Sequence, residues 1–196
     1  MAIGRNLPAE IDRGVVTTVH QGECFVSSDA GLAYATVLGS CIAACIRDVV
    51  ARVGGMNHFL LASPSDNSRD RFGASARYGA FAMEQLINMV LTQGSGRKAN
   101  LEIKVFGGGM LNSALTDIGA KNIAFVSEFL DNEGYRMASH DLGGTFARKV
   151  VFQPSTGRAF VRKLDSAAGE TVAREELVIA RRKPSELART PEIELF

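Results

Sequence analysis

The sequence predicts an α+β fold in which mixed β-sheets pack with flanking helices. Short segments rich in Val, Ile, Thr and Ala are bounded by Gly, Asp and Ser, a pattern typical of β-strands. Two longer windows repeat apolar residues every three or four positions, as amphipathic helices do. The strands come in runs with only these two helices between them, which favours mixed sheets over a regular βαβ array.

Strands dominate the first part of the chain. Residues 1–13 are polar, contain Pro8 and are expected to form a flexible N-terminal arm. Five strands are then expected, over 15–19, 23–27, 33–38, 41–48 and 53–61. Residues 63–75 consist of turn-forming residue types and predict a long surface loop, a kind of loop that often carries function.

The two helices and the remaining strands follow. Apolar rows at four-residue spacing predict a helix over 77–92, which Gly94 ends. A strand over 101–106 leads into Gly107, Gly108 and Gly109, and a second helix over 119–133 ends at Gly134. Further strands are expected over 135–139, 148–153 and 158–164, with 154–157 as the turn of the last hairpin. We therefore expect one domain over 14–164, followed by a charged C-terminal extension over 165–196.

Composition narrows the class of protein. The 196 residues include 22 Lys plus Arg and 21 Asp plus Glu, a balance that argues against a nucleic-acid partner or a membrane surface. No apolar run approaches the roughly 18 residues that cross a bilayer, so no membrane insertion is expected. The first residues lack the apolar region of a signal peptide, and the three cysteines lack disulfide-framework or metal-site spacing. We expect reduced thiols in a cytoplasmic protein, with no cofactor and no metal.

One cysteine and one histidine lie where they could form a catalytic pair. A hairpin turning at 48–51 would place Cys41 directly opposite His58, with their Cβ atoms about 4.5–5.5 Å apart. An imidazolium at that distance lowers the thiol pKa and produces a thiolate nucleophile. Backbone N–H groups near Gly39 and Ser40 could hold an oxyanion. The alternative is that Cys41 is simply a buried small apolar residue, the usual role of a free cysteine.

The other candidate groups favour structural roles. Cys45 and Cys24 are expected in the core. A disulfide between Cys41 and Cys45 is disfavoured because residues four apart in one strand are roughly 13 Å apart. The glycines at 107–109 lack the fingerprint of a phosphate loop, so we interpret them as a tight turn or a substrate-facing backbone.

Several motifs together resemble the chemoreceptor glutamine deamidase family, CheD. They are LGSC at 38–41, GGMNHFLL at 54–61, FGGGM at 106–110, IGAKNI at 118–123, DLGG at 141–144 with Arg148, and TGRAFVRKL at 156–164. The spacing of seventeen residues from Cys41 to His58 also matches the family pattern. The resemblance covers about residues 14–164, and the terminal IELF is similar to members that carry a C-terminal extension.

The resemblance implies an enzyme that deamidates glutamines of methyl-accepting chemotaxis receptors to glutamates, with 14–164 as its catalytic domain. It places the nucleophile on Cys41 and the general base and acid on His58. It also implies a catalytic threonine six residues before the cysteine, where this sequence has Ala35 with Thr36 beside it. Either the alignment slips by one residue or another group fills this role. The implied fold is related to bacterial toxin-type cysteine deamidases.

The resemblance also leaves a second function open. Some members of the family partner a CheC-type chemotaxis phosphatase. The chain could therefore act as an adaptor that binds a receptor or such a phosphatase with little catalysis.

Overall fold

A computed structural model describes residues 14–61, 74–111 and 113–180. Its strands are β1 Val15–Thr18, β2 Cys24–Ser27, β3 Leu32–Leu38, β4 Ile42–Asp48, β5 Val53–Asn57, β6 Leu101–Gly107, β7 Met137–Leu142, β8 Arg148–Gln153 and β9 Arg158–Lys163. Its helices are α2 Ala74–Gln93, the short 3₁₀ helix η1 Lys98–Asn100, α3 Ser113–Asn132 and α4 Ser166–Ala180. The expected N-terminal arm and nearly all of the expected loop at 63–75 lie outside the described residues.

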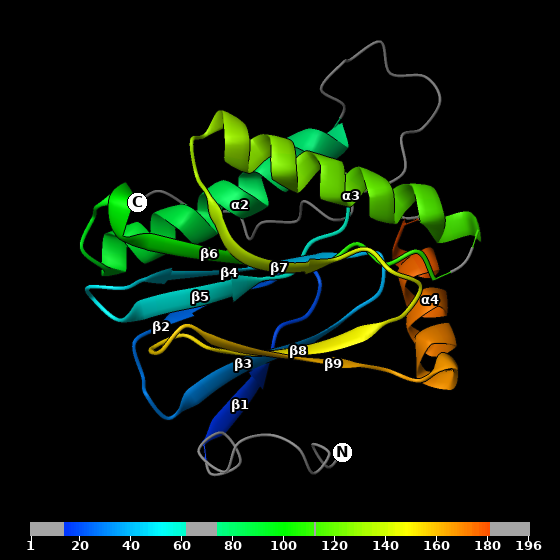
Figure 1. Cartoon of the computed structure of the whole chain (residues 1–196), viewed down its shortest axis with the longest axis horizontal. Helices are drawn as coiled ribbons and strands as arrows, with labels where there is room; N and C mark the ends of the chain where they lie inside the picture. Colours follow the sequence, from blue (N-terminus) through cyan, green and yellow to red (C-terminus); the bar gives the residue numbers. More distant parts are fainter. Residues whose placement is uncertain (1–13, 62–73, 112, 181–196) are drawn as a thin grey trace, which may run out of the picture.

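These elements form three layers, as Figure 1 shows. Helices α2 and α3 cover one face of a five-stranded sheet of order β2-β5-β4-β6-β7. The other face of that sheet packs on a four-stranded sheet of order β1-β3-β8-β9. Each sheet contains one parallel pair, β1 with β3 and β6 with β7, among antiparallel pairs. The predicted α+β class with mixed sheets and flanking helices is confirmed, and the relation to toxin deamidases stays a prediction.

Both helices start before the predicted positions, and a third helix is present. The second helix is predicted from residue 119 onward, whereas α3 begins at Ser113. Gly119 therefore lies inside α3. A Cβ there would come within 2.6 Å of the carbonyl oxygen of Gly109, so the position requires glycine. Helix α4 lies in the expected extension, across one end of the layers (Figure 1). Of the helices that the structure describes, none has both the length and the apolar character needed to cross a bilayer.

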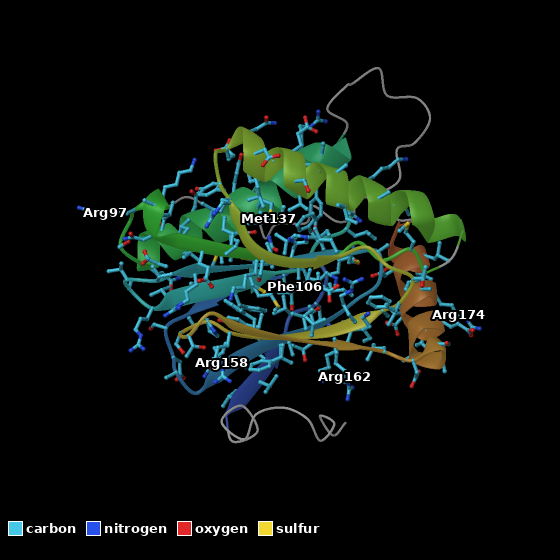
Figure 2. All side chains as sticks on the ribbon, viewed as in Figure 1. Arg97, Phe106, Met137, Arg158, Arg162 and Arg174 are labelled. Carbon is cyan, nitrogen blue, oxygen red and sulfur yellow. The ribbon has the colours of Figure 1, made fainter. Side chains whose placement is uncertain are left out.

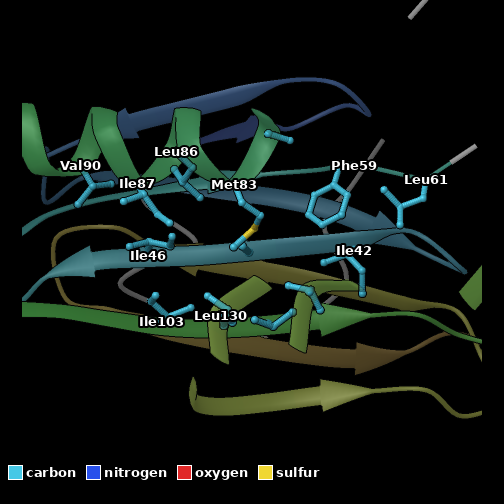
Figure 3. Close-up of a cluster of buried hydrophobic side chains, with 14 residues drawn as sticks. Ile42, Ile46, Phe59, Leu61, Met83, Leu86, Ile87, Val90, Ile103 and Leu130 are labelled. Carbon is cyan, nitrogen blue, oxygen red and sulfur yellow. The ribbon is translucent and has the colours of Figure 1, made fainter. Parts of the chain in front are cut away.

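Strand β4 is the centre of the core. Ile42, Ala44 and Ile46 face the helices and pack with residues such as Met83 and Leu86 of α2 (Figure 3). The alternate residues Cys41, Ala43 and Cys45 face the second sheet. Because both faces of the strand are covered, its sequence is almost continuously apolar.

The hairpin of β4 and β5 has a different register from the predicted one. Asp48 pairs with Val53 and Ile42 with Phe59, so Cys41 is not directly opposite His58. The loop is four residues long because the Asp48 carboxylate accepts hydrogen bonds from Val50 N (3.0 Å) and Ala51 N (2.9 Å). The shift is an even number of residues, and it therefore leaves Cys41 and His58 on one face of the sheet.

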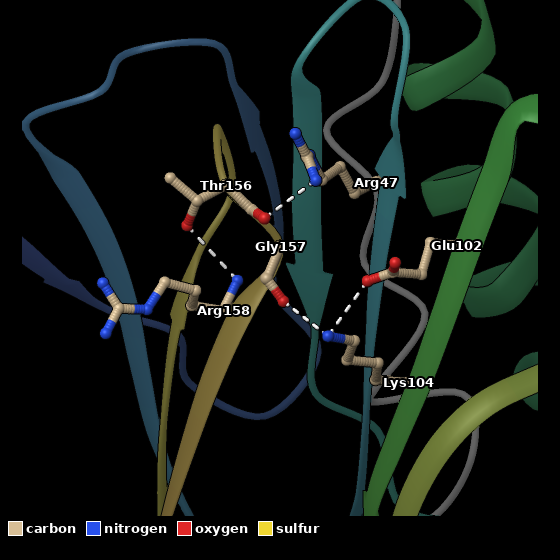
Figure 4. A network of polar contacts seen from close by, with 6 residues as sticks. All are labelled: Arg47, Glu102, Lys104, Thr156, Gly157 and Arg158. Atoms are coloured by element: carbon tan, nitrogen blue, oxygen red, sulfur yellow. Dashed lines mark hydrogen bonds and ion pairs between the residues drawn. The ribbon is translucent and has the colours of Figure 1, made fainter.

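The two sheets are also joined by polar contacts at the tip of the β8–β9 hairpin (Figure 4). Arg47 of β4 donates to the carbonyl oxygen of Thr156 at 2.8 Å. Lys104 of β6 donates to that of Gly157 at 2.8 Å and pairs with Glu102 at 2.9 Å. These bonds hold the predicted 154–157 turn against the five-stranded sheet.

Arg148 at the start of β8 is a fully buried cation. Its guanidinium donates to the carbonyl and carboxylate oxygens of Asp141 and to the carbonyl oxygen of Gly143. Its Cζ atom also lies 4.8 Å from the ring centroid of Phe146. The side chain thus connects the end of β7 and the 143–146 loop to the four-stranded sheet.

We expect Arg148→Met to lower the free energy of unfolding by about 2 kcal/mol, because the buried carbonyl oxygen of Gly143 loses its donor and the ion pair with the partly exposed Asp141 is broken. Urea denaturation measures the loss. Arg162→Met is the matched control, since Arg162 on β9 is exposed and points away from the sandwich (Figure 2). A loss for Arg148→Met no larger than that for the control would contradict this role.

Candidate active site

Three predicted site residues lie buried on the side where the two sheets face each other, and two of them, Thr36 and His58, are in contact. Thr36 comes from β3, Cys41 from the loop before β4, and His58 from the position directly after β5. All three are buried. Strand alternation places Thr36, and not Ala35, on the face of β3 that meets the five-stranded sheet. Thr36 has the same parity as Tyr34 and Leu38, which pack between the sheets, whereas Ala35 packs on the opposite face with Val151.

The hydroxyl of Thr36 determines how the imidazole of His58 is held. Thr36 Oγ1 donates to the carbonyl oxygen of Val19 at 2.8 Å and lies 2.9 Å from His58 Nδ1. Because its only proton goes to Val19, Oγ1 accepts from Nδ1–H, and Val19 O lies 3.3 Å from the same nitrogen. This network assigns the proton to Nδ1 and leaves Nε2 unprotonated.

Two buried nitrogens at the site have no hydrogen-bond partner among the described residues. They are Nε2 of His58 and Nε2 of Gln21. The Cys41 thiol lies 3.8 Å from Gln21 Oε1, so this glutamine borders the sulfur. Unpaired buried polar groups are rare in folded proteins, and these two are suited to a substrate amide.

The electrostatics of the pair differ from the sequence-based expectation. Burial, followed by the charge of Glu176 and a hydrogen bond to it, raises the pKa of the Cys41 thiol well above its ordinary value. Burial lowers the pKa of His58. The expected lowering of the thiol pKa by an imidazolium is therefore wrong for the described conformation, because desolvation disfavours the charged form of both groups. The pair is held as thiol and neutral imidazole.

Three consecutive backbone amides next to the thiol bind a carboxylate. Gly39 N, Ser40 N and Cys41 N donate to the two oxygens of Glu176, at 2.9, 2.6 and 3.2 Å. The hydroxyl of Ser40 adds a fourth bond at 2.7 Å. A Cβ on Gly39 would lie 2.7 Å from Glu176 Oε2, so this position needs glycine for space. Residues 39–41 thus form an anion-binding site, and Glu176 is a member that the sequence analysis did not predict.

The carbonyl oxygens of the same three residues accept hydrogen bonds from Gly108, Gly109 and Asn122. Gly108 N donates to Cys41 O at 2.8 Å, and Gly109 N donates to Gly39 O at 2.6 Å. Asn122 of α3 donates to Ser40 O at 2.8 Å and accepts from Leu61 N at 2.9 Å. These bonds preorganise the amides of residues 39–41. Sequence reasoning missed Asn122, although a polar residue inside a predicted amphipathic helix was its available signal.

The other two cysteines lie outside this cluster. Cys45 is fully buried in β4, and Cys24 of β2 lies 3.8 Å from the sulfur of Met89. Burial raises the pKa of Cys24 to about 12. All three cysteines are free thiols. Cys45 lies in the core as expected, whereas Cys24 is partly buried and packs against the core from β2.

Comparisons with known proteins give the family. A family model described as "CheD chemotactic sensory transduction" matches residues 60–163. A Caulobacter vibrioides protein named "Probable chemoreceptor glutamine deamidase CheD" is 51% identical over 147 residues, which cover 75% of this chain and 77% of the relative. A Methylobacillus flagellatus protein of the same name is 45% identical over 177 residues, which cover 88% and 85%.

A solved structure also resembles the fold at low similarity. A Neisseria meningitidis protein of the DUF152 family matches with a TM-score of 0.40 and 10% identity, over 70% of this chain and 65% of the other. At that level the match carries no functional argument. The family is shown instead by the family model, which matches more than half of the chain, and by relatives at 45–51% identity: this chain belongs to the CheD family.

Proposed function

We propose that this protein hydrolyses glutamine side-chain amides of methyl-accepting chemotaxis receptors to glutamates. The names of its relatives supply the reaction and the substrate class. The observation that carries the proposal is the anion site of residues 39–41, whose three amides converge beside a cysteine thiol. Acyl transfer requires such donors, because negative charge develops on the carbonyl oxygen of the substrate.

In the proposed reaction, Cys41 is the nucleophile and His58 is the general base and acid. With substrate bound, Nε2 of His58 takes the proton of the thiol, and the sulfur attacks the carboxamide carbon. The amides of residues 39–41 hold the resulting oxyanion. The C–N bond then breaks, and His58 returns the proton to the nitrogen, which leaves as ammonia. A water deprotonated by His58 opens the thioester, giving glutamate and the free thiol.

Mass spectrometry of a receptor cytoplasmic fragment incubated with the wild-type protein tests this function. Each converted glutamine gains the mass difference between an amide and an acid, and the peptides locate it. A fragment that binds the protein but is not converted would contradict the proposal. That result would favour the alternative of an adaptor for receptors or for a CheC-type phosphatase. The high thiol pKa of the described conformation is the observation that favours this alternative.

Thr36 is proposed as a positioning residue that acts through His58. We expect Thr36→Val to lower kcat about 10- to 100-fold with little change in KM, because Nδ1–H loses its nearer acceptor at 2.9 Å and keeps only Val19 O at 3.3 Å, which holds the imidazole less firmly. The measurement is the pH profile of kcat for receptor deamidation.

Two further results decide whether the role of Thr36 is positional. Thr36→Ser keeps the hydroxyl and should restore most of kcat and the wild-type pH profile. Equal loss in both variants, with an unchanged profile, would mean that Thr36 acts only through packing between the sheets.

A further inference from the structure

We propose that α4 is an intramolecular product mimic, in which Glu176 occupies the anion site where a substrate glutamine side chain binds. The receptor and α4 then compete for one site, and α4 must leave before deamidation begins. This inference rests on the proposed function, since the product of glutamine hydrolysis is itself a glutamate side chain.

The first argument is chemical identity. Glu176 is 5% exposed, and its carboxylate accepts four hydrogen bonds, all from neutral N–H or O–H donors of residues 39–41. Neutral donors can hold the carbonyl oxygen of an amide or the carboxylate of the product, whereas a salt bridge would select the charged acid. The site therefore matches both oxygens of the product glutamate. It can also hold the carbonyl oxygen of a substrate glutamine, whose amide nitrogen is a donor and needs a different partner.

The second argument is that α4 is held mainly along one narrow face. Ala173 is buried, Leu177 packs against the core, and both share the face of Glu176, as residues three or four apart in a helix do. The outer face carries exposed Arg174, Glu175 and Val178, and Figure 2 shows Arg174 pointing away from the body.

A pocket of about 410 Å³, open to solvent, lies beside α4. It is lined by residues of α4, such as Gly169 and Ala173, and of the body, such as Leu111 and Phe146. Gly169 lies inside the helix with open space around it, and glycine is less favourable than alanine inside a helix. Among the described residues, the four hydrogen bonds of the Glu176 carboxylate are the strongest polar attachment of α4 to the body.

The third argument concerns the nucleophile. The charge of Glu176 and its hydrogen bond contribute, after burial, to the raised pKa of Cys41. An occupied anion site thus suppresses the thiolate as well as excluding substrate. A receptor glutamine carries no charge, so its entry removes this effect.

Alkylation of Cys41 tests the proposal without using deamidase activity. Glu176→Ala is compared with Glu175→Ala, which removes the neighbouring exposed carboxylate of the same helix. Iodoacetamide labelling of the Cys41 peptide, followed by mass spectrometry, should be about tenfold faster in Glu176→Ala than in wild type, and unchanged in Glu175→Ala. The Cys24 peptide is the internal reference for global unfolding. Equal labelling of Cys41 in the two variants would overturn the proposal.

The isosteric Glu176→Gln variant tests whether the side chain occupies the position of the substrate. The amide introduced by this substitution should be hydrolysed to a carboxylate at a rate independent of protein concentration, and adding Cys41→Ala should stop the conversion. An introduced amide that stays intact, in a protein that deamidates receptor glutamines, would overturn the product mimic.

The two proposals fail in different ways. Faster Cys41 labelling in Glu176→Ala with no deamidation by any variant supports occupation of the site by α4 and contradicts the proposed function. Receptor deamidation that is equally fast in wild type, Glu175→Ala and Glu176→Ala supports the proposed function and overturns competition by α4.

Discussion

Cys41→Ala is expected to lower the rate of receptor glutamine deamidation by about 10⁴-fold or more, the largest effect of any single change considered for this protein. The reason is that the proposed reaction forms a thioester on this sulfur, and no other described thiol lies in the site. Of the other two described cysteines, Cys24 lies in β2 and Cys45 is buried within β4. The measurement is the initial rate of glutamine-to-glutamate conversion in a receptor fragment, read by mass spectrometry.

Cys24→Ala is the matched control, because it removes a half-buried thiol that has no contact with the anion site. It should keep close to the wild-type rate. Substantial deamidation by Cys41→Ala would show that another group is the nucleophile. A receptor effect in cells that survives Cys41→Ala, with no conversion by any variant, would support the adaptor alternative.

The second-largest effect is expected for His58→Ala, which should lower kcat about 10³-fold. Without the imidazole, the buried thiol has no base to take its proton, and ammonia has no acid to protonate it. The pKa of the thiol is already raised by burial, so little thiolate forms without that base. His140→Ala is the control, since His140 on β7 is exposed. A rate for His58→Ala close to that of His140→Ala would contradict the assigned role.

The His58→Ala variant should also change the pH dependence of the free energy of unfolding. The pKa of His58 is lower in the folded protein than its ordinary value of 6.5. Below about pH 6.5 the unfolded chain therefore binds a proton that the folded chain does not, and stability falls as the pH falls toward the folded pKa. In urea titrations, His58→Ala should show a smaller loss of stability over this range than wild type.

Local pattern was sufficient for most of the strands and for placing Cys41 and His58 on one face of the sheet. The run of apolar residues at 41–48 predicts a strand covered on both faces, and β4 has those neighbours. The predicted hairpin placed Cys41 and His58 on one face. The true register differs by two residues, and that face is kept because side chains alternate with a period of two.

Other features depended on contacts between distant parts of the chain. The Asp48 carboxylate closes a four-residue loop, a detail that turn propensities did not show. Thr36, and not Ala35, lies beside His58 because its face of β3 meets the five-stranded sheet. Helix α3 begins at Ser113, before the predicted start at 119, and its Gly119 lies against the backbone at Gly109.

The sequence by itself determined the α+β class, the resemblance to a family and the candidate pair of Cys41 and His58, since these depend on residue order and short-range periodicity. The tertiary structure alone decided that Thr36 Oγ1 faces Nδ1 of His58, that Asn122 supports Ser40, and that the Glu176 carboxylate binds residues 39–41. Residues 40 and 176 are 136 positions apart. Their contact depends on how α4 packs across the end of the sandwich, and no local pattern in the chain encodes that packing.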